Sequence, residues 1–287
     1  MIATHFCLVH STSSVGCLMQ LAATLILSMI FACSIVSGRA RARARAGSAL
    51  RSTRLRLRIS MVRASSNDLT SQLFERKLWS EGYKYVIGVD EAGRGPLAGP
   101  VVAASLVCLD VDVLNDSDID ARDSKALSEK KREKIYEEII SKPEKYQYHV
   151  TCIDHARIDE TNILKATMEA MALSIENLQK KLHCSDTSNE EEKKLSYALV
   201  DGNKTPSTLS IPARAIVKGD AQVHSIALAS IIAKVTRDRM MVEYDKVYPG
   251  YGFAKHKGYG TREHIMSIHK LGPCAIHRMS FKPLKGR

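Results

Sequence analysis

The sequence predicts an α/β fold, and two observations lead to that prediction. Apolar runs typical of strands alternate with helical segments from residue 83 towards the C-terminal end. Hydrophobic residues make up 45% of the 287-residue chain, which is enough for one large core or two modest ones. No internal repeat is visible. We therefore expect a sheet that is covered by helices.

The first half of this region contains three predicted strands and one helix. Residues 85–89 form an apolar run typical of a buried strand, and residues 101–109 form a second run after a turn rich in proline and glycine. Ser128 is placed to cap a helix through residues 129–136, whose many charges predict a solvent-facing side. Residues 146–153 predict the third strand.

The second half contains longer helices and two short strands. Apolar residues at helical spacing predict helices over 162–182, 225–244 and 261–271. Two short strands are predicted between the first two of these helices, over 195–200 and 213–217. An aspartate follows each short strand closely. We therefore expect acidic ligands to gather at one edge of the sheet.

The positive charge of the chain is concentrated near its N-terminus. The formal net charge is +11, but residues 1–67 contain nine Arg residues and no Asp or Glu. The remainder is close to neutral, with 33 basic residues against 31 acidic ones. Net charge is therefore weak support for nucleic-acid binding by the folded part of the chain.

Residues 1–70 have the composition of a targeting leader. Residues 15–36 are nearly uncharged and long enough to span a bilayer or to form a signal-peptide core. Residues 38–47 alternate Arg with Ala, in the acid-free style of an organellar transit peptide. This order predicts a two-part import leader for a plastid or mitochondrion. The alternatives are a disordered tail on a cytoplasmic protein and a membrane anchor through residues 15–36.

The cysteines argue against a zinc site and against a disulfide scaffold. The chain has seven cysteines and no Cys-x-x-Cys pair. Three of them lie in the leader, and the four in the remainder are scattered. Free thiols of this kind fit a reducing compartment.

Two adjacent carboxylates, Asp90 and Glu91, follow the first apolar run and precede the turn Gly93-Arg94-Gly95. Carboxylates are the ligands that hard cations such as magnesium prefer. The glycines let the backbone and the Arg94 guanidinium approach a phosphate or sugar closely. A nucleotide phosphate-binding loop is excluded, because Arg94 and Gly95 stand where that loop needs Lys and Ser or Thr. The motif therefore indicates phosphate chemistry on a polyanion.

Two more aspartates, Asp201 and Asp220, follow later strands, so four carboxylates are available. Two-metal phosphoryl chemistry uses such a set, because carboxylates hold two divalent ions about 3.5–4 Å apart that clamp the attacking and leaving oxygens. Without metal ions the four negative charges would repel one another and a polyanionic substrate. The combination predicts a two-metal site.

Each carboxylate also has a purely structural alternative. Neighbours on a regular strand point to opposite faces, so Asp90 and Glu91 converge only if the strand ends or bulges between them. Asp201 precedes Gly and Asn, which fits an Asx turn. Asp220 lies where a helix N-cap is expected. Asp238 is expected to form a salt bridge on its helix.

These motifs resemble those of ribonuclease HII. The resemblance covers about residues 83–283 in order, without the leader and without the Glu-rich insertion at 183–194. The segments that match the family lie at 88–96, 99–101, 123–125, 201–203, 218–220, 226–238, 251–261 and 277–281.

The resemblance implies a ribonuclease H-like mixed β-sheet flanked by helices, with a C-terminal helical extension. Residues 71–287 would form the catalytic domain, and its helical segment would begin at about residue 245. The implied activity is endonucleolytic cleavage of the RNA strand of RNA–DNA hybrids and cleavage 5′ to single ribonucleotides in duplex DNA. The products would carry 3′-hydroxyl and 5′-phosphate ends. The bacterial style of the motifs implies a monomer, and no sliding-clamp partner can be read from the sequence.

The family's catalytic and metal-binding roles fall on four acidic positions, Asp90, Glu91, Asp201 and Asp220. The implied cofactors are two divalent ions, Mg²⁺ or Mn²⁺. The family's substrate contacts are a ribose-sensing turn, a ring that packs on the sugar, and two phosphate contacts. In this sequence they fall on Gly93, Arg94, Gly95, Tyr259, Ser124 and Lys125. A Gly-rich turn suits this role, because the 2′-hydroxyl that distinguishes RNA from DNA must be reached without steric obstruction.

Two rival functions belong to different classes. A catalytically silent hybrid-binding protein would share the fold, but the presence of all four carboxylates argues against it. A metal-dependent nuclease without ribose specificity would share the metal site. Comparing duplexes with and without a ribonucleotide separates these possibilities.

Overall fold

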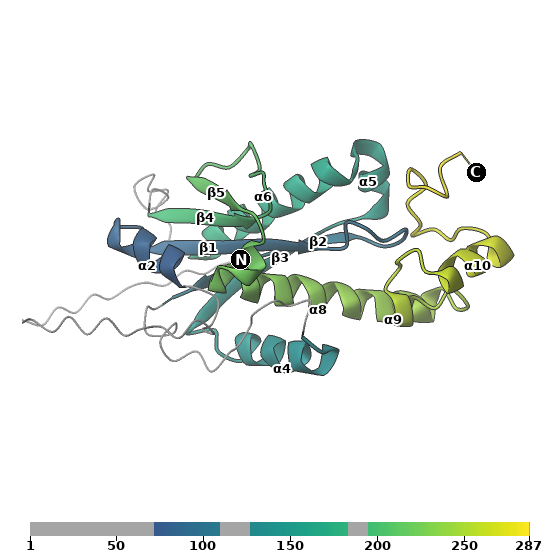
Figure 1. Cartoon of the computed structure of the whole chain (residues 1–287), viewed down its shortest axis with the longest axis horizontal. Helices are drawn as coiled ribbons and strands as arrows, with labels where there is room; N and C mark the ends of the chain where they lie inside the picture. Colours follow the sequence, from purple (N-terminus) through teal and green to yellow (C-terminus); the bar gives the residue numbers. More distant parts are fainter. Residues whose placement is uncertain (1–71, 110–126, 183–194, 287) are drawn as a thin grey trace, which may run out of the picture. The chain divides into compact units, whose positions relative to one another are not determined.

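The computed structural model describes residues 72–109, 127–182 and 195–286. Within them, five strands form one mixed sheet in the order β3-β2-β1-β4-β5 (Figure 1). Strand β2 is antiparallel to both β1 and β3, whereas β4 is parallel to both β1 and β5. The strands span Tyr85–Ala92 (β1), Val101–Cys108 (β2), Tyr146–Ile153 (β3), Ser196–Asp201 (β4) and Ala213–Ile216 (β5). The predicted mixed α/β fold is therefore confirmed.

Helices cover both faces of the sheet, with α5 and α6 on one side and α8 on the other (Figure 1). The described α-helices are Leu73–Ser80 (α2), Glu129–Ile140 (α4), His155–Thr161 (α5), Ile163–Leu182 (α6), His224–Val247 (α8), Phe253–His256 (α9) and Arg262–Leu271 (α10). A 3₁₀ helix, η1, spans Gly219–Ala221. The Ser128 side chain caps α4 by accepting a hydrogen bond from the Lys131 N–H, as the sequence predicted. Helices α2, α5 and α9 were not predicted, and residues 248–260, which include α9, were expected to form a loop.

The two faces of the sheet have separate cores because successive strand residues point to opposite sides. Ile87 and Val89 of β1 pack with the apolar face of α6. Ala104 and Leu106 of β2 pack with α8 and α4 on the other side. Helix α8 crosses β1 closely at Gly88, where an added Cβ would lie 2.2 Å from the backbone carbon of Ser225. Only glycine permits this approach.

The N-terminus of α8 is capped from outside the helix. Its N-cap residue, Val223, provides no side-chain hydrogen bond. Instead, the buried carboxylate of Glu75 in α2 accepts hydrogen bonds from the Ser225 N–H and the Ser225 hydroxyl, both at 2.9 Å. Asp220 lies inside η1, so the alternative that it caps α8 is wrong.

The C-terminal segment packs on the far end of α8 and on the loop after β1. Its apolar cluster includes Met241 of α8, Leu97 of the loop, Phe253, Ile268 and Leu284. No helix within residues 72–109, 127–182 and 195–286 has both the length and the apolar character that crossing a bilayer requires. The leader, including the possible anchor at residues 15–36, lies outside the described residues.

Candidate active site

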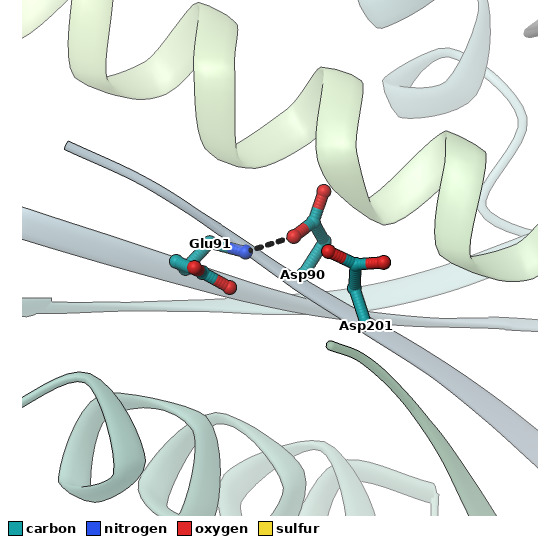
Figure 2. Close-up of side chains that lie close together, drawn as sticks. All are labelled: Asp90, Glu91 and Asp201. Atoms are coloured by element: carbon teal, nitrogen blue, oxygen red, sulfur yellow. Dashed lines mark hydrogen bonds between the residues drawn. The ribbon is translucent and has the colours of Figure 1, made fainter. Parts of the chain in front are cut away.

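Asp90 and Asp201 are brought together by the parallel pairing of β1 with β4. Val89 is the register partner of Val200, so the next residue on each strand is an aspartate at the same level of the sheet. Both side chains point towards α8 (Figure 2). Residues 111 positions apart in the sequence thus become neighbours because two parallel strands end at the same edge.

Glu91 joins these aspartates even though the strand does not end before it. We expected β1 to end or bulge between Asp90 and Glu91, but its regular pairing with β2 continues through Glu91 to Ala92, so that expectation is wrong. Pairing with β4 stops at Val89, which leaves the strand edge beside Glu91 open. The longer glutamate side chain can therefore reach around this edge. Carboxylate oxygens of Asp90, Glu91 and Asp201 all lie within 4.8 Å of one another.

Backbone and hydroxyl groups fix the orientation of the two aspartates. The Glu91 N–H donates to Asp90 Oδ1 at 2.7 Å (Figure 2). Ser230 of α8 also hydrogen-bonds the Asp90 carboxyl. The Gly219 N–H donates to Asp201 Oδ1 at 2.6 Å. That bond spans 18 residues, so a tertiary contact helps to orient Asp201.

Burial and neighbouring negative charge raise the pKa values of Asp90 and Glu91. Burial is the main reason that the pKa of Asp90 lies well above its usual range, and the charges of Glu91 and Asp201 add to it. Burial also raises the pKa of Glu91, although the guanidinium of Arg94, 3.2 Å from Glu91 Oε1, opposes this shift. Buried like charges favour either protonation or a bound cation. The site is therefore short of positive charge.

Asp220, the fourth predicted ligand, is not part of the group of three. It is buried in η1, directly after the glycine whose N–H holds Asp201. The chain thus brings it next to the site, but it does not line the pocket described below. Its role as a metal ligand stays a prediction.

The three carboxylates open into a pocket of about 290 Å³ that also contains most of the predicted substrate contacts. An added Cβ on Gly95 would lie 3.5 Å from Cε1 of Tyr259, so the turn and the exposed tyrosine ring are close neighbours in its lining. Ser124 and Lys125 lie outside the described residues. The lining residues are Asp90, Glu91, Ala92, Gly93, Arg94, Gly95, Asp201, Ser230, Lys234, Arg237 and Tyr259.

Gly93 is held in a conformation that requires glycine. Its φ is +98°, in the left-handed region. An added Cβ would lie 2.1 Å from Nε of Arg237 and 2.7 Å from the carbonyl oxygen of Pro100. The buried Arg237 side chain donates a hydrogen bond of 3.0 Å to this same carbonyl, and this bond stabilises the turn.

Three pocket residues of α8 escaped the sequence prediction: Ser230, Lys234 and Arg237. They lie four and three residues apart, on one face of a helix that is otherwise apolar there. This polar stripe in an apolar run was the available signal. Lys234 also forms a salt bridge at 2.7 Å with Asp238, which confirms the structural interpretation of Asp238.

Comparisons with known proteins agree on one family. Residues 87–284 match the sequence profile described as Ribonuclease HII. A ribonuclease HII of Caldicellulosiruptor bescii is 50% identical over 207 residues, which cover 72% of this chain and 91% of that protein. The solved ribonuclease H2 of Pyrococcus horikoshii has a TM-score of 0.53 at 26% identity and covers 70% of this chain and 95% of its own. A PCNA:RNase HII complex from Archaeoglobus fulgidus gives a TM-score of 0.52 at 25% identity, covering 69% of this chain and 95% of that one.

Proposed function

The chain belongs to the ribonuclease HII family, and we propose that the pocket around Asp90, Glu91 and Asp201 is its active site. As a member of this family it is an endonuclease that hydrolyses the RNA strand of RNA–DNA hybrids. The observation that supports the location is the convergence of three carboxylates within 4.8 Å beside a glycine turn and an exposed tyrosine. No single element of the fold would bring these groups together by itself.

The donor set of the pocket fits divalent cations, which the ribonuclease H family needs. All three groups offer carboxylate oxygens, the ligands of hard ions, and the raised pKa values of Asp90 and Glu91 mark a deficit of positive charge. Two Mg²⁺ or Mn²⁺ ions would be held by Asp90, Glu91 and Asp201, with Asp220 as the proposed fourth ligand. When bound, such ions activate the attacking water and stabilise the leaving oxygen, which leaves 3′-hydroxyl and 5′-phosphate ends.

The protein's own groups would bind the phosphodiester and recognise the sugar. Arg94 and Lys234 supply positive charge inside the pocket for the substrate backbone. The backbone of the turn around Gly93 can approach a 2′-hydroxyl closely, and the ring of Tyr259 offers a flat surface for the sugar. We propose that these contacts allow cleavage 5′ to a single ribonucleotide in duplex DNA.

Ser124 and Lys125 are the remaining proposed substrate contacts. In the family resemblance they contact phosphate, and their hydroxyl and ammonium groups suit that role. They are separated by only a few residues from the start of α4, whose first turn is described. Their position relative to the pocket stays a prediction.

The most informative experiment compares three duplexes with magnesium present. One is a full RNA–DNA hybrid, one is DNA with a single ribonucleotide, and one is all DNA. The proposed function predicts cleavage of the first two and none of the third, because the sugar contacts require a 2′-hydroxyl. Cleavage of all three would identify a nuclease without ribose specificity. Binding without turnover would identify a silent hybrid-binding protein.

We also propose a role in repair of ribonucleotides in organellar DNA, with residues 1–70 as the import leader. The Arg-rich, acid-free composition of that segment supports import, and the bacterial style of the motifs suits an organelle of bacterial ancestry. Fusing residues 1–70 to a fluorescent reporter tests this. Signal confined to plastids or mitochondria is expected, whereas diffuse cytosolic signal would reject import and a membrane pattern would favour an anchor.

We propose that the folded part, residues 71–287, acts as a monomeric catalytic domain. A sliding clamp is a partner to test, since the Archaeoglobus relative was solved with PCNA. Size-exclusion chromatography coupled to light scattering, with and without a clamp ring, measures both properties. A dimer that persists on dilution would contradict the proposed monomer.

A further inference from the structure

A short segment near the C-terminus pairs with the loop that follows the catalytic strand. The Gly99 N–H donates to the Ile276 carbonyl at 2.9 Å, and the Arg278 N–H donates to the Leu97 carbonyl at 2.8 Å. Between these bonds lies an antiparallel bridge that joins Ala98 and His277. This pairing places two consecutive side chains of the tail, those of residues 277 and 278, beside the substrate turn.

The Arg278 guanidinium is fully buried and donates to four backbone carbonyls of that loop. Nη2 donates to Gly93 at 2.7 Å and to Pro100 at 3.1 Å, Nη1 donates to Arg94 at 3.1 Å, and Nε donates to Gly99 at 2.9 Å. Burying a charge is costly unless its hydrogen bonds are satisfied. Only arginine has enough donors in a rigid planar fork to hold four carbonyls at once. The side chain therefore fixes the shape of the turn.

The neighbouring His277 is linked to Tyr259 through His264. His264 Nδ1 lies 2.9 Å from the Tyr259 carbonyl oxygen, which only accepts, so Nδ1 must carry the proton. In neutral His264, Nε2 then accepts from His277 Nε2 at 3.1 Å. His277 Nδ1 in turn accepts from the Cys274 N–H at 2.9 Å. With this assignment of protons, each of these three contacts has one donor and one acceptor, and both imidazoles are buried.

The tail therefore holds both sides of the pocket that would receive the ribose. Arg278 holds the turn, and His277 holds the backbone of Tyr259 through His264. The ring of that tyrosine lies next to Gly95 in the pocket lining. We propose that His277 and Arg278 are positioning residues that set the spacing between the turn and Tyr259, an inference that rests on the proposed active site. An error of about 1 Å in such spacing can reduce a rate by about 100-fold.

The test replaces Arg278 by Lys, which keeps the charge but cannot donate to four carbonyls. The substrate is duplex DNA with a single ribonucleotide, and kcat is expressed per folded molecule, with the folded fraction measured by near-UV circular dichroism. Leu284→Ala is the matched control, because Leu284 is buried in the same C-terminal cluster. We expect Arg278→Lys to lower kcat by about 10-fold or more with KM changed by less than about 3-fold. The control should keep its kcat even where its melting temperature falls equally.

Equal kcat values for Arg278→Lys and the control would overturn the proposal and leave Arg278 a purely structural residue. If Arg278→Lys does not fold, two substitutions of His277 test the proposal instead. His277→Gln keeps a donor at the position of Nε2, whereas His277→Asn keeps only the acceptor at the position of Nδ1. The proposal predicts normal kcat for Gln and reduced kcat for Asn, and equal values for both would contradict it.

Failure of the active-site assignment is recognised separately in the same assay. Wild-type enzyme and Asp90→Asn are measured alongside the tail variants. If Asp90→Asn cuts normally, the proposed metal site fails whatever the tail variants do. If wild type cuts and Asp90→Asn does not, the tail variants alone decide whether His277 and Arg278 position the pocket.

Discussion

Asp90 shows how a single residue combines structural cost and function. Its carboxyl is buried, lies beside Glu91 and Asp201, and has a raised pKa. A protein core would avoid such a cluster, because buried like charges destabilise the folded state. Ser230 and a backbone N–H offset this cost only in part. A divalent cation would offset much more, which is why the cluster is best understood as a metal site.

Single residues of the site differ in how well the sequence could predict them. Asp90, Glu91 and Asp201 were predicted from their places after apolar runs, and the structure brings them together. Arg278 had no signal of this kind, because arginine near a C-terminus is ordinarily exposed. Its four carbonyl partners belong to a loop more than 175 residues earlier, and only tertiary contacts reveal them.

His264 carries a prediction for the pH dependence of stability. Burial is the main cause that lowers its pKa to about 4, well below the ordinary value of 6.5. As the pH falls below 6.5, His264 becomes protonated in the unfolded chain but stays neutral in the folded chain. The free energy of unfolding therefore declines until the pH reaches the pKa of the folded state. His264→Asn keeps a donor for the Tyr259 carbonyl but does not titrate.

The measurement is the melting temperature of both proteins between about pH 7 and about pH 5. The variant should lose less stability than wild type as the pH falls, whatever its starting value. Parallel curves would show that His264 does not contribute to the acid sensitivity.

Among the elements, β1 and α8 determine the geometry of the site. Strand β1 carries Asp90 and Glu91, and α8 lies close above it because Gly88 has no side chain. The sequence predicted β1 only to residue 89, since adjacent carboxylates resemble the start of a loop. The structure continues the strand to Ala92 because β2 pairs with it over its whole length there. Tertiary pairing thus overrides the local preference.

Glu75 of α2 caps the N-terminus of α8, so its removal should destabilise the protein. Its carboxylate accepts two hydrogen bonds at 2.9 Å from Ser225, at the positive end of the 24-residue helix. Glu75→Ala should lower the free energy of unfolding by about 1–3 kcal/mol, because it leaves a buried donor unsatisfied. Urea denaturation measures this, with Glu81→Ala, an exposed residue at the opposite end of α2, as a control. Equal stability of the two variants would contradict the capping role.

At the scale of the whole molecule, the fold gathers its chemistry at one edge of a mixed sheet. The carboxylates come from two parallel strands, the supporting polar groups from α8, and the opposing ring from the loop before α10. The C-terminal tail supports this arrangement by pairing with the loop after β1. Sequence motifs predicted the members of the pocket. The supporting residues of α8 and of the tail lie in segments that match the family, but only the tertiary contacts revealed their roles.

The central claim is that the carboxylate group binds divalent cations and thereby cuts the substrate. Removing one negative ligand should weaken metal binding by at least about 10-fold and suppress turnover, without unfolding the protein. Glu243→Gln is a matched control, because Glu243 is an exposed partner of Lys246 away from the pocket.

The direct measurement is the rate of cleavage of a single-ribonucleotide duplex as magnesium is titrated, for wild type, Asp90→Asn and Glu243→Gln. We predict saturating, magnesium-dependent cleavage by wild type and Glu243→Gln, with no measurable cleavage by Asp90→Asn despite normal folding and duplex binding. Cleavage by Asp90→Asn at near wild-type rate would contradict the assignment of the site.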